Sequence, residues 1–153
     1  MNRRTTRSTV AAVIALSAGL VLAGCSDSAE ATPKLQVSDA FMPAPTSDMA
    51  GGFLVVKNDS KTADKLTKVT SDLSDDITIH ETKNQKMQEV KSFDIPANGE
   101  LDLERGGSHI MFMGLKKKPT QGEKVAIELH FEKAGTVKVD LPVKEATYNP
   151  KHH

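Results

Sequence analysis

The alternation of apolar and polar positions is the strongest pattern in this chain, and it predicts β-strands. No stretch of helical length has an apolar period of 3.6 residues, and turn-forming residues are dense between the alternating segments. Several short strands at regular spacing predict an all-β fold, an antiparallel Greek-key β-sandwich or barrel. The segments that show alternation or β-branched enrichment are "GFLVVKN" (52–58), "DITIHET" (76–82), "ELDLE" (100–104), "KVAIELHFE" (124–132) and "TVKVDLPV" (136–143).

A further strand-like segment, "GGSHIMFMGL" (106–115), places unusual side chains together. Successive side chains of a strand point to opposite faces, so His109, Met111 and Met113 share one face. The other face carries Ile110 and Phe112. A methionine alone most often fills a gap in a core, but a histidine followed by two alternating methionines indicates a site.

A second histidine belongs with this group. His80 ends the strand "DITIH" and shares a face with Thr78, and Met87 follows it in the chain. Both His80 and His109 lie at strand ends, where the rim of a sandwich commonly carries function. By contrast, His130 alternates with four apolar residues of its strand, which predicts an ordinary histidine on the outer face.

Histidine and methionine together favour monovalent copper. Thioethers are soft, neutral donors that select Cu(I), and imidazole also binds copper. A set of two imidazoles and two thioethers carries no formal charge. It disfavours Zn(II), for which cysteine, histidine and carboxylate ligands are usual.

The first 25 residues have the pattern of a targeting segment. Three arginines precede the apolar run "AAVIALSAGLVLAG", which is shorter than the roughly 20 residues that span a bilayer. The "LAGC" at 22–25 resembles a bacterial lipobox, in which Cys25 becomes the lipidated first residue. Cys25 is the only cysteine, so no intrachain disulfide and no internal thiolate are available.

Removal of this segment changes the charge of the chain. The full sequence has 20 basic and 20 acidic residues, and loss of the three arginines leaves 17 against 20. This balance excludes a nucleic-acid-binding domain, which would be strongly basic. The expected organisation is a lipoprotein signal peptide (1–24), a lipid-anchored flexible linker (25–34), a copper-binding β-sandwich domain (35–147) and a disordered tail (148–153).

The arrangement His80, Met87 and His109-Ile110-Met111 resembles the signature of the periplasmic copper chaperones of the PCuA(C) type. Between Met87 and His109 lie 21 residues, the interval of that family. The resemblance runs from about residue 36 to residue 143. One departure is the interval between His80 and Met87, which is shorter here than in the family. Family members often have a methionine directly after the first histidine, where this chain has Glu81.

The resemblance implies a cupredoxin-like fold and a Cu(I) site made of His80, Met87, His109 and Met111, with Met113 packed beneath it. It also implies a carrier rather than an enzyme. The expected function is delivery of Cu(I), outside the cytoplasm, to an apo-cuproprotein such as the copper centre of cytochrome c oxidase. Lipidation at Cys25 would hold the chain at the bacterial cell membrane. His152 and His153 could add a weaker Cu(II) site.

Other classes of protein fit less well. An electron-transfer cupredoxin needs a cysteine with two histidines, and Cys25 is far from the site in sequence. A copper enzyme would want more histidines around an open position, and a hydrolase motif such as Gly-x-Ser-x-Gly is absent from the sequence. The alternative that stays open is a metal-free cell-surface lipoprotein that acts as a binding module.

Overall fold

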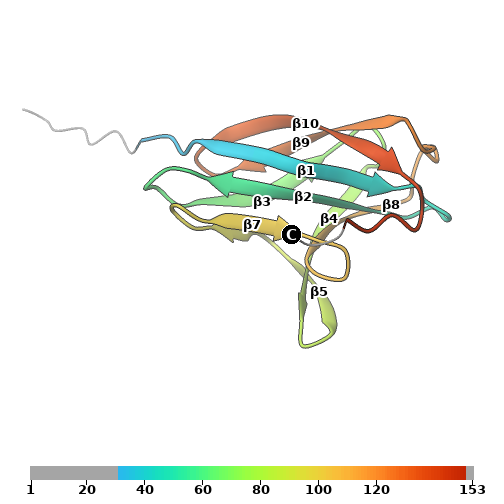
Figure 1. The fold of residues 1–153 in the computed structure, drawn as a ribbon, viewed down its shortest axis with the longest axis horizontal. Helices are drawn as coiled ribbons and strands as arrows, with labels where there is room; N and C mark the ends of the chain where they lie inside the picture. The colour runs from blue at the N-terminus through green and yellow to red at the C-terminus, as the bar shows by residue number, and fades with distance from the viewer. Residues whose placement is uncertain (1–30, 151–153) are drawn as a thin grey trace, which may run out of the picture.

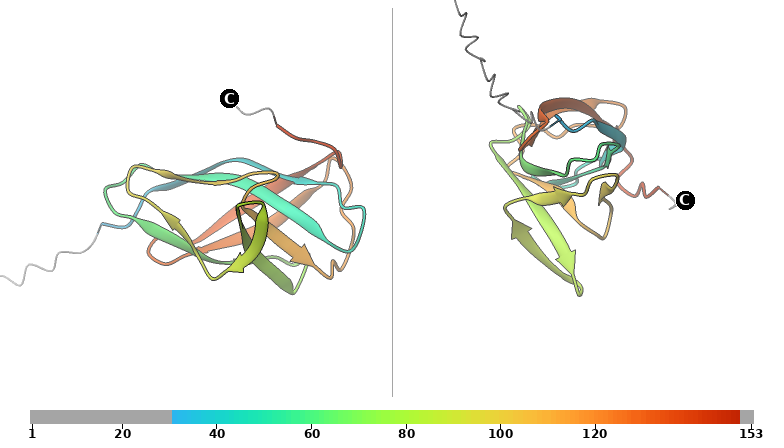
Figure 2. Two further views of the ribbon diagram at one scale, coloured as in Figure 1. Left: turned by 90° about the horizontal axis from the view of Figure 1, so that it is seen from below. Right: turned by 90° about the vertical axis from the view of Figure 1, so that its left-hand side faces the viewer.

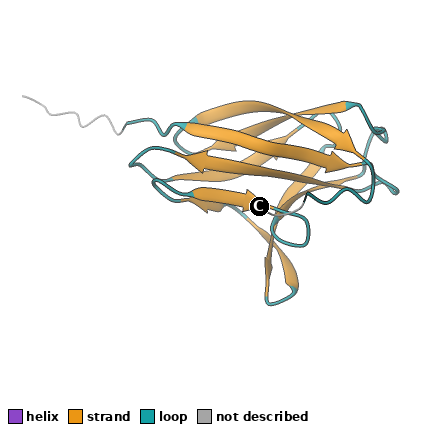
Figure 3. Cartoon of the chain, viewed as in Figure 1, coloured by secondary structure: helices purple, strands orange, loops and turns teal. Residues whose placement is uncertain are grey.

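The computed structural model describes residues 31–150, and this part of the chain consists of strands and loops without a helix (Figures 1 and 3). The predicted all-β fold is confirmed. The strands of the described part are β1 (Leu35–Pro43), β2 (Ala50–Asn58), β3 (Asp64–Thr70), β4 (Asp76–Lys83), β5 (Lys86–Val90), β6 (Phe93–Ile95), β7 (Glu100–Leu103), β8 (His109–Met113), β9 (Lys124–Phe131) and β10 (Gly135–Lys144).

The strands join into one curved sheet in the order β5-β4-β8-β2-β1-β10-β9-β3-β6, and β7 pairs with β2. The neighbouring strands are antiparallel except β1 and β10, which run parallel through the pairs Met42–Val143 and Pro43–Lys144. Seen from the end, the sheet curls round to face itself as a barrel-like sandwich (Figure 2). This curvature gives each strand an inner face and an outer face.

Alternation along the strands fills the space between the facing halves of the sheet. In β9 the four apolar residues expected to point inward are all buried, and His130 lies between them on the outer face. In β8 only Ile110 and Phe112 are buried, so the alternation predicted for this strand is confirmed. The core is aliphatic and phenylalanine-rich, which follows from a sequence with one tyrosine and no tryptophan.

Strand β1 was not predicted, because its alternation is broken in the middle. Asp39 has a left-handed φ of 52°, and the register of β1 against β2 shifts between Ser38 and Phe41. Such a bulge moves one residue out of the period-2 pattern. The segment "FMPAPTSDM" (41–49) has two prolines and is loop-like in composition, but the prediction of a loop is wrong for Met42, which belongs to β1 and is completely buried.

The segment after His80 is a tight hairpin. Lys83 pairs with Lys86, and the two residues between them, Asn84 and Gln85, have φ values of 51° and 63°. Two central residues with positive φ define a type I′ turn, whose twist matches that of the flanking strands. The β4–β5 hairpin projects from the body of the sandwich (Figure 1) and carries Met87 on β5.

Several expectations concern residues outside the described part: the signal peptide, Cys25, most of the linker, His152 and His153. In residues 31–150 no helix is long and apolar enough to cross a membrane. The first residue of the expected tail makes specific contacts. The Tyr148 ring packs edge-on against Phe41, and the Tyr148 carbonyl accepts a hydrogen bond of 2.7 Å from Arg105.

The hairpin turn gives a direct test of this geometry. Gln85→Gly should stabilise the protein by about 1 kcal/mol, because glycine adopts positive φ without the penalty that other residues have there. The change is measured by urea denaturation. The matched control is Lys86→Gly, one residue later in a strand, which should destabilise the protein. Equal effects of the two glycines would contradict the assigned turn.

Candidate metal centre

His80 and His109 lie directly opposite each other on adjacent strands. They form a cross-strand pair between β4 and β8, and their side chains extend from the same face of the sheet. The ring centroids are 5.5 Å apart and the ring planes differ by 16°. Two residues that are 29 positions apart in sequence thus present their imidazoles side by side, and both side chains are partly buried.

Each ring forms its hydrogen bond through one nitrogen, and His80 Nδ1 has a lone pair in the tautomer whose Nε2–H donates to Thr78. His109 Nδ1 donates to the Gly107 carbonyl at 2.9 Å, so His109 Nε2 is the nitrogen with a free lone pair. His80 Nε2 is 2.8 Å from the Thr78 hydroxyl, while His80 Nδ1 is buried and has no hydrogen-bond partner. A buried polar atom without a partner costs about 1–3 kcal/mol. An ion bound to His80 Nδ1 would remove that cost.

The Gly107 carbonyl accepts hydrogen bonds from both strands that carry the histidine pair. Besides the His109 ring, it accepts a hydrogen bond of 3.0 Å from the Thr82 hydroxyl on β4. Position 107 requires glycine for reasons of space, because a Cβ there would lie 2.8 Å from Glu104 Cγ. The preceding Gly106 has a φ of +86°. The turn at Gly106 and Gly107 therefore orients the Gly107 carbonyl toward side chains of both β4 and β8.

Two methionines flank the histidine pair on the same face. Counting only the residue pairs on this face, Met111 is one pair along from the histidines, opposite Thr78 on β4 and Gly51 on β2. Met87 is one such pair along in the other direction, opposite Thr82. Met87 is therefore a diagonal neighbour of His80, and such positions are about 7–8 Å apart, within reach of a long side chain. Met87 is 56% exposed, whereas Met111 is partly buried.

Glu81, which stands where the family often has a methionine, points away from the site. It follows His80 in a strand and so lies on the opposite face. Its carboxylate forms a 2.8 Å ion pair with Lys83, whose hydrogen bond lowers the pKa of Glu81 below its usual value. The residue that faces His80 from β5 is instead Glu89, its direct cross-strand partner.

A row of aromatic rings continues from the His109 ring across the neighbouring strands β2 and β1. Phe53 lies 6.3 Å from the His109 ring, Phe41 stacks on Phe53 at 5.1 Å, and Tyr148 meets Phe41 edge-on at 5.0 Å. The sequence analysis did not assign Phe41, Phe53, Tyr148 or Glu89 to the site. For Glu89 a signal existed, because the alternation of "KMQEV" puts it on the face of Met87.

The structure separates the remaining candidates from the pair. His130 is on β9, where its ring nitrogens lie 2.8 Å from the Thr70 hydroxyl and 3.2 Å from the Thr136 hydroxyl, as expected for an ordinary outer-face histidine. Met113 is on the face of Met111 but two residue pairs away from the histidines. Within residues 31–150, no three His, Cys, Asp or Glu side chains gather into a group that could hold a metal ion. The soft donors near the histidine pair are the thioethers of Met87 and Met111.

Solved structures share this fold. The apo PCuAC domain from PmoF1 superposes with a TM-score of 0.68 at 28% identity, over 73% of this chain and 94% of that domain. The Cu(I) form of DR1885 from Deinococcus radiodurans superposes with a TM-score of 0.61 at 26% identity, over 80% of this chain and 85% of that protein. The fold is therefore the cupredoxin-like all-β fold of PCuAC domains.

The sequence has relatives among bacterial lipoproteins. It is 41% identical over 116 residues to "Putative lipoprotein Lxx21020" of Leifsonia xyli subsp. xyli (strain CTCB07), which covers 72% of this chain and 70% of that protein. Residues 35–143 match the family described as "Putative lipoprotein LpqE-like". That match spans almost every strand described above. The chain belongs to this LpqE-like lipoprotein family, with the fold of the PCuAC copper-chaperone domains.

Proposed function

We propose that this protein is an extracytoplasmic metallochaperone that binds one Cu(I) ion through His80, His109, Met111 and Met87. The observation that carries the proposal is the cross-strand pair of His80 and His109, in which one buried ring nitrogen lacks a partner. The two rings lie side by side with centroids 5.5 Å apart, so that one nitrogen of each could bind the same ion after rotation of the side chains. The methionines on either side of the pair supply sulfur from the same face.

The chemistry of these donors favours monovalent copper. Neutral thioethers stabilise a soft ion of low charge, and two imidazoles complete a four-donor set without anionic ligands. Outside the cytoplasm thiols tend to form disulfides, whereas the thioether of methionine remains available as a donor. The comparison with the Cu(I) form of DR1885 supports the same ion for this chain.

The position of the donors suits a protein that releases its ion. The site lies on the outer face of the sheet, and Met87 is more than half exposed. An incoming ligand from a recipient protein could replace Met87 first and His80, whose Nδ1 atom is buried, last. Copper would then move by stepwise ligand exchange, and it would keep its charge throughout.

The recipient would be a membrane cuproenzyme, and the copper centre of cytochrome c oxidase is our specific proposal. A lipid on Cys25 would keep the chaperone at the membrane surface, close to such an enzyme. Similarity to lipoproteins supports this anchor. The proposed role is that of a carrier, without catalysis.

The first test removes one imidazole. His109→Ala should weaken Cu(I) binding at least 100-fold, because the substitution deletes a donor from the middle of the set. Competition with a chromophoric Cu(I) chelator measures the affinity and the stoichiometry, which should be one ion per chain. The matched control is His130→Ala, on the outer face of β9, which should leave the affinity unchanged.

Two results would contradict the assignment. Equal affinities of the His109→Ala variant and the unaltered protein would show that copper binds elsewhere. If the unaltered protein takes up no copper at all, the metal-free binding module becomes the better account of this lipoprotein.

The second test concerns the short hairpin. Met87→Leu should weaken Cu(I) binding about tenfold, equivalent to about 1.4 kcal/mol, because the type I′ turn brings Met87 within diagonal reach of His80. Met42→Leu is the control, since Met42 is completely buried and the substitution conserves volume. An unchanged affinity of Met87→Leu would reduce the site to His80, His109 and Met111.

A further inference from the structure

A second group of soft donors lies at the opposite end of the same face from Met87. Asp76 at the start of β4 is paired with Met113 at the end of β8. Met49 directly precedes Ala50, whose partner is Phe112, so Met49 lies close to the Met113 end of β8. The two segments are also joined just beyond the strands, because Leu115 N donates to the Asp48 carbonyl at 3.0 Å.

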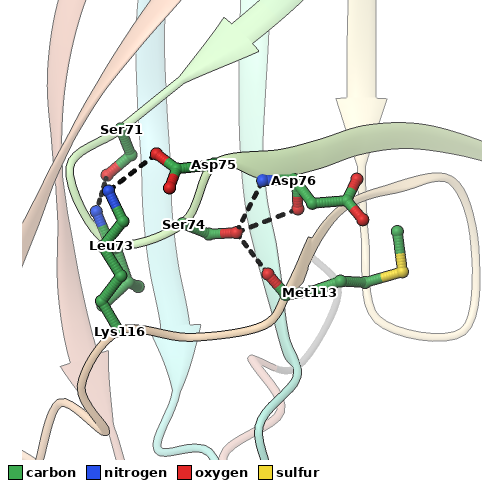
Figure 4. A network of polar contacts seen from close by, with 7 residues as sticks. All are labelled: Ser71, Leu73, Ser74, Asp75, Asp76, Met113 and Lys116. Atoms are coloured by element: carbon green, nitrogen blue, oxygen red, sulfur yellow. Dashed lines mark hydrogen bonds and ion pairs between the residues drawn. The ribbon is translucent and has the colours of Figure 1, made fainter.

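The backbone at this end is fixed by a buried serine. Ser74 is 2% exposed, and its hydroxyl donates to the Met113 carbonyl and accepts a 3.0 Å hydrogen bond from Asp76 N. Figure 4 shows the result: the Asp76 carboxylate and the Met113 thioether extend to the same side of the sheet. A 2.7 Å ion pair between Lys116 and Asp75 closes the adjacent turn. These contacts fix the backbone from which the two donor side chains extend.

The exposure of Met49 also needs an explanation. Met49 (50% exposed) and Met87 (56%) are the two large hydrophobic side chains that stand exposed in residues 31–150. A methionine that fills a gap in a core would be buried. Met87 instead lies on β5 and Met49 lies directly before β2, and these strands are the neighbours of the two that carry the histidine pair. This distribution indicates a role for the sulfur atoms at the surface.

We infer that Met49, Met113 and Asp76 form a second, weaker site for a soft monovalent cation, next to the histidine site. Two thioethers select a soft ion, and the carboxylate offsets its positive charge. Residues two apart in a strand are separated by about 6.8 Å. Met111 thus lies between the two sites and could contact an ion moving from one to the other.

The inference deepens the proposed function and rests on it, because it assigns a route by which Cu(I) reaches or leaves the histidine site. In each step one bond from copper to a nitrogen or sulfur of the histidine site breaks as one bond to a sulfur or carboxylate oxygen of the second site forms, or the reverse. The copper keeps its charge, no electron is transferred, and no proton needs to move.

The test uses the purified protein labelled with ¹³C in its methionine methyl groups. It is titrated with Ag(I), which has the charge of Cu(I) and keeps its oxidation state, in a chloride-free buffer. The first equivalent should shift the methyl signals of Met87 and Met111. Further Ag(I) should shift those of Met49 and Met113, and the signal of the buried Met42 serves as the internal control.

Substitutions then separate the two sites. Met113→Leu and Asp76→Asn should each weaken the second binding phase at least tenfold, with the thermal unfolding midpoint recorded to verify folding. The inference is overturned if the Met49 and Met113 signals stay in place at two equivalents, or if Met113→Leu leaves the second phase unaltered. Failure of the first equivalent to shift Met111 would instead count against the proposed histidine site.

Discussion

The register between β4 and β8 is the constraint on which the rest of the structure depends. It pairs His80 with His109, Thr78 with Met111, and Asp76 with Met113, so the histidines, the two methionines and Asp76 share the outer face. Because side chains alternate along a strand, a slip of one residue would turn all of them toward the core. The site is therefore a property of the pairing of two strands rather than of either segment alone.

The inner face of the same two strands specifies this register. Ile79 is paired with Ile110, and Ile77 with Phe112; three of these four side chains are buried. Burial of each large apolar side chain is worth about 1.5–3 kcal/mol. A slipped register would forfeit several kcal/mol from a total stability that is typically about 5–15 kcal/mol. Burial of these apolar side chains thus stabilises the position of the donors whether or not a metal ion is bound.

The sequence was sufficient to predict the strands with regular alternation and the shared face of His109, Met111 and Met113. The pairing of His80 with His109 depended on family resemblance, because alternation within a strand says nothing about its neighbour. Two local backbone features account for the missed strand β1 and for the β4–β5 hairpin, and β3 and β6 were also not predicted. The bulge at Asp39 broke the pattern of β1 and misplaced Met42, and the type I′ turn at Asn84 and Gln85 made a segment that read as a short polar loop into a hairpin. The row of Phe53, Phe41 and Tyr148 joins three distant segments and exists only in the folded chain.

The central claim is that nitrogen and sulfur from separate strands meet at one copper ion. X-ray absorption at the copper edge of the Cu(I)-loaded protein tests it most directly, because the scattering of sulfur differs from that of nitrogen and oxygen. We predict a mixed shell of two nitrogen and two sulfur neighbours. A shell of nitrogen and oxygen alone would contradict this account, since it would remove the methionines that the β4–β8 register brings beside the histidine pair.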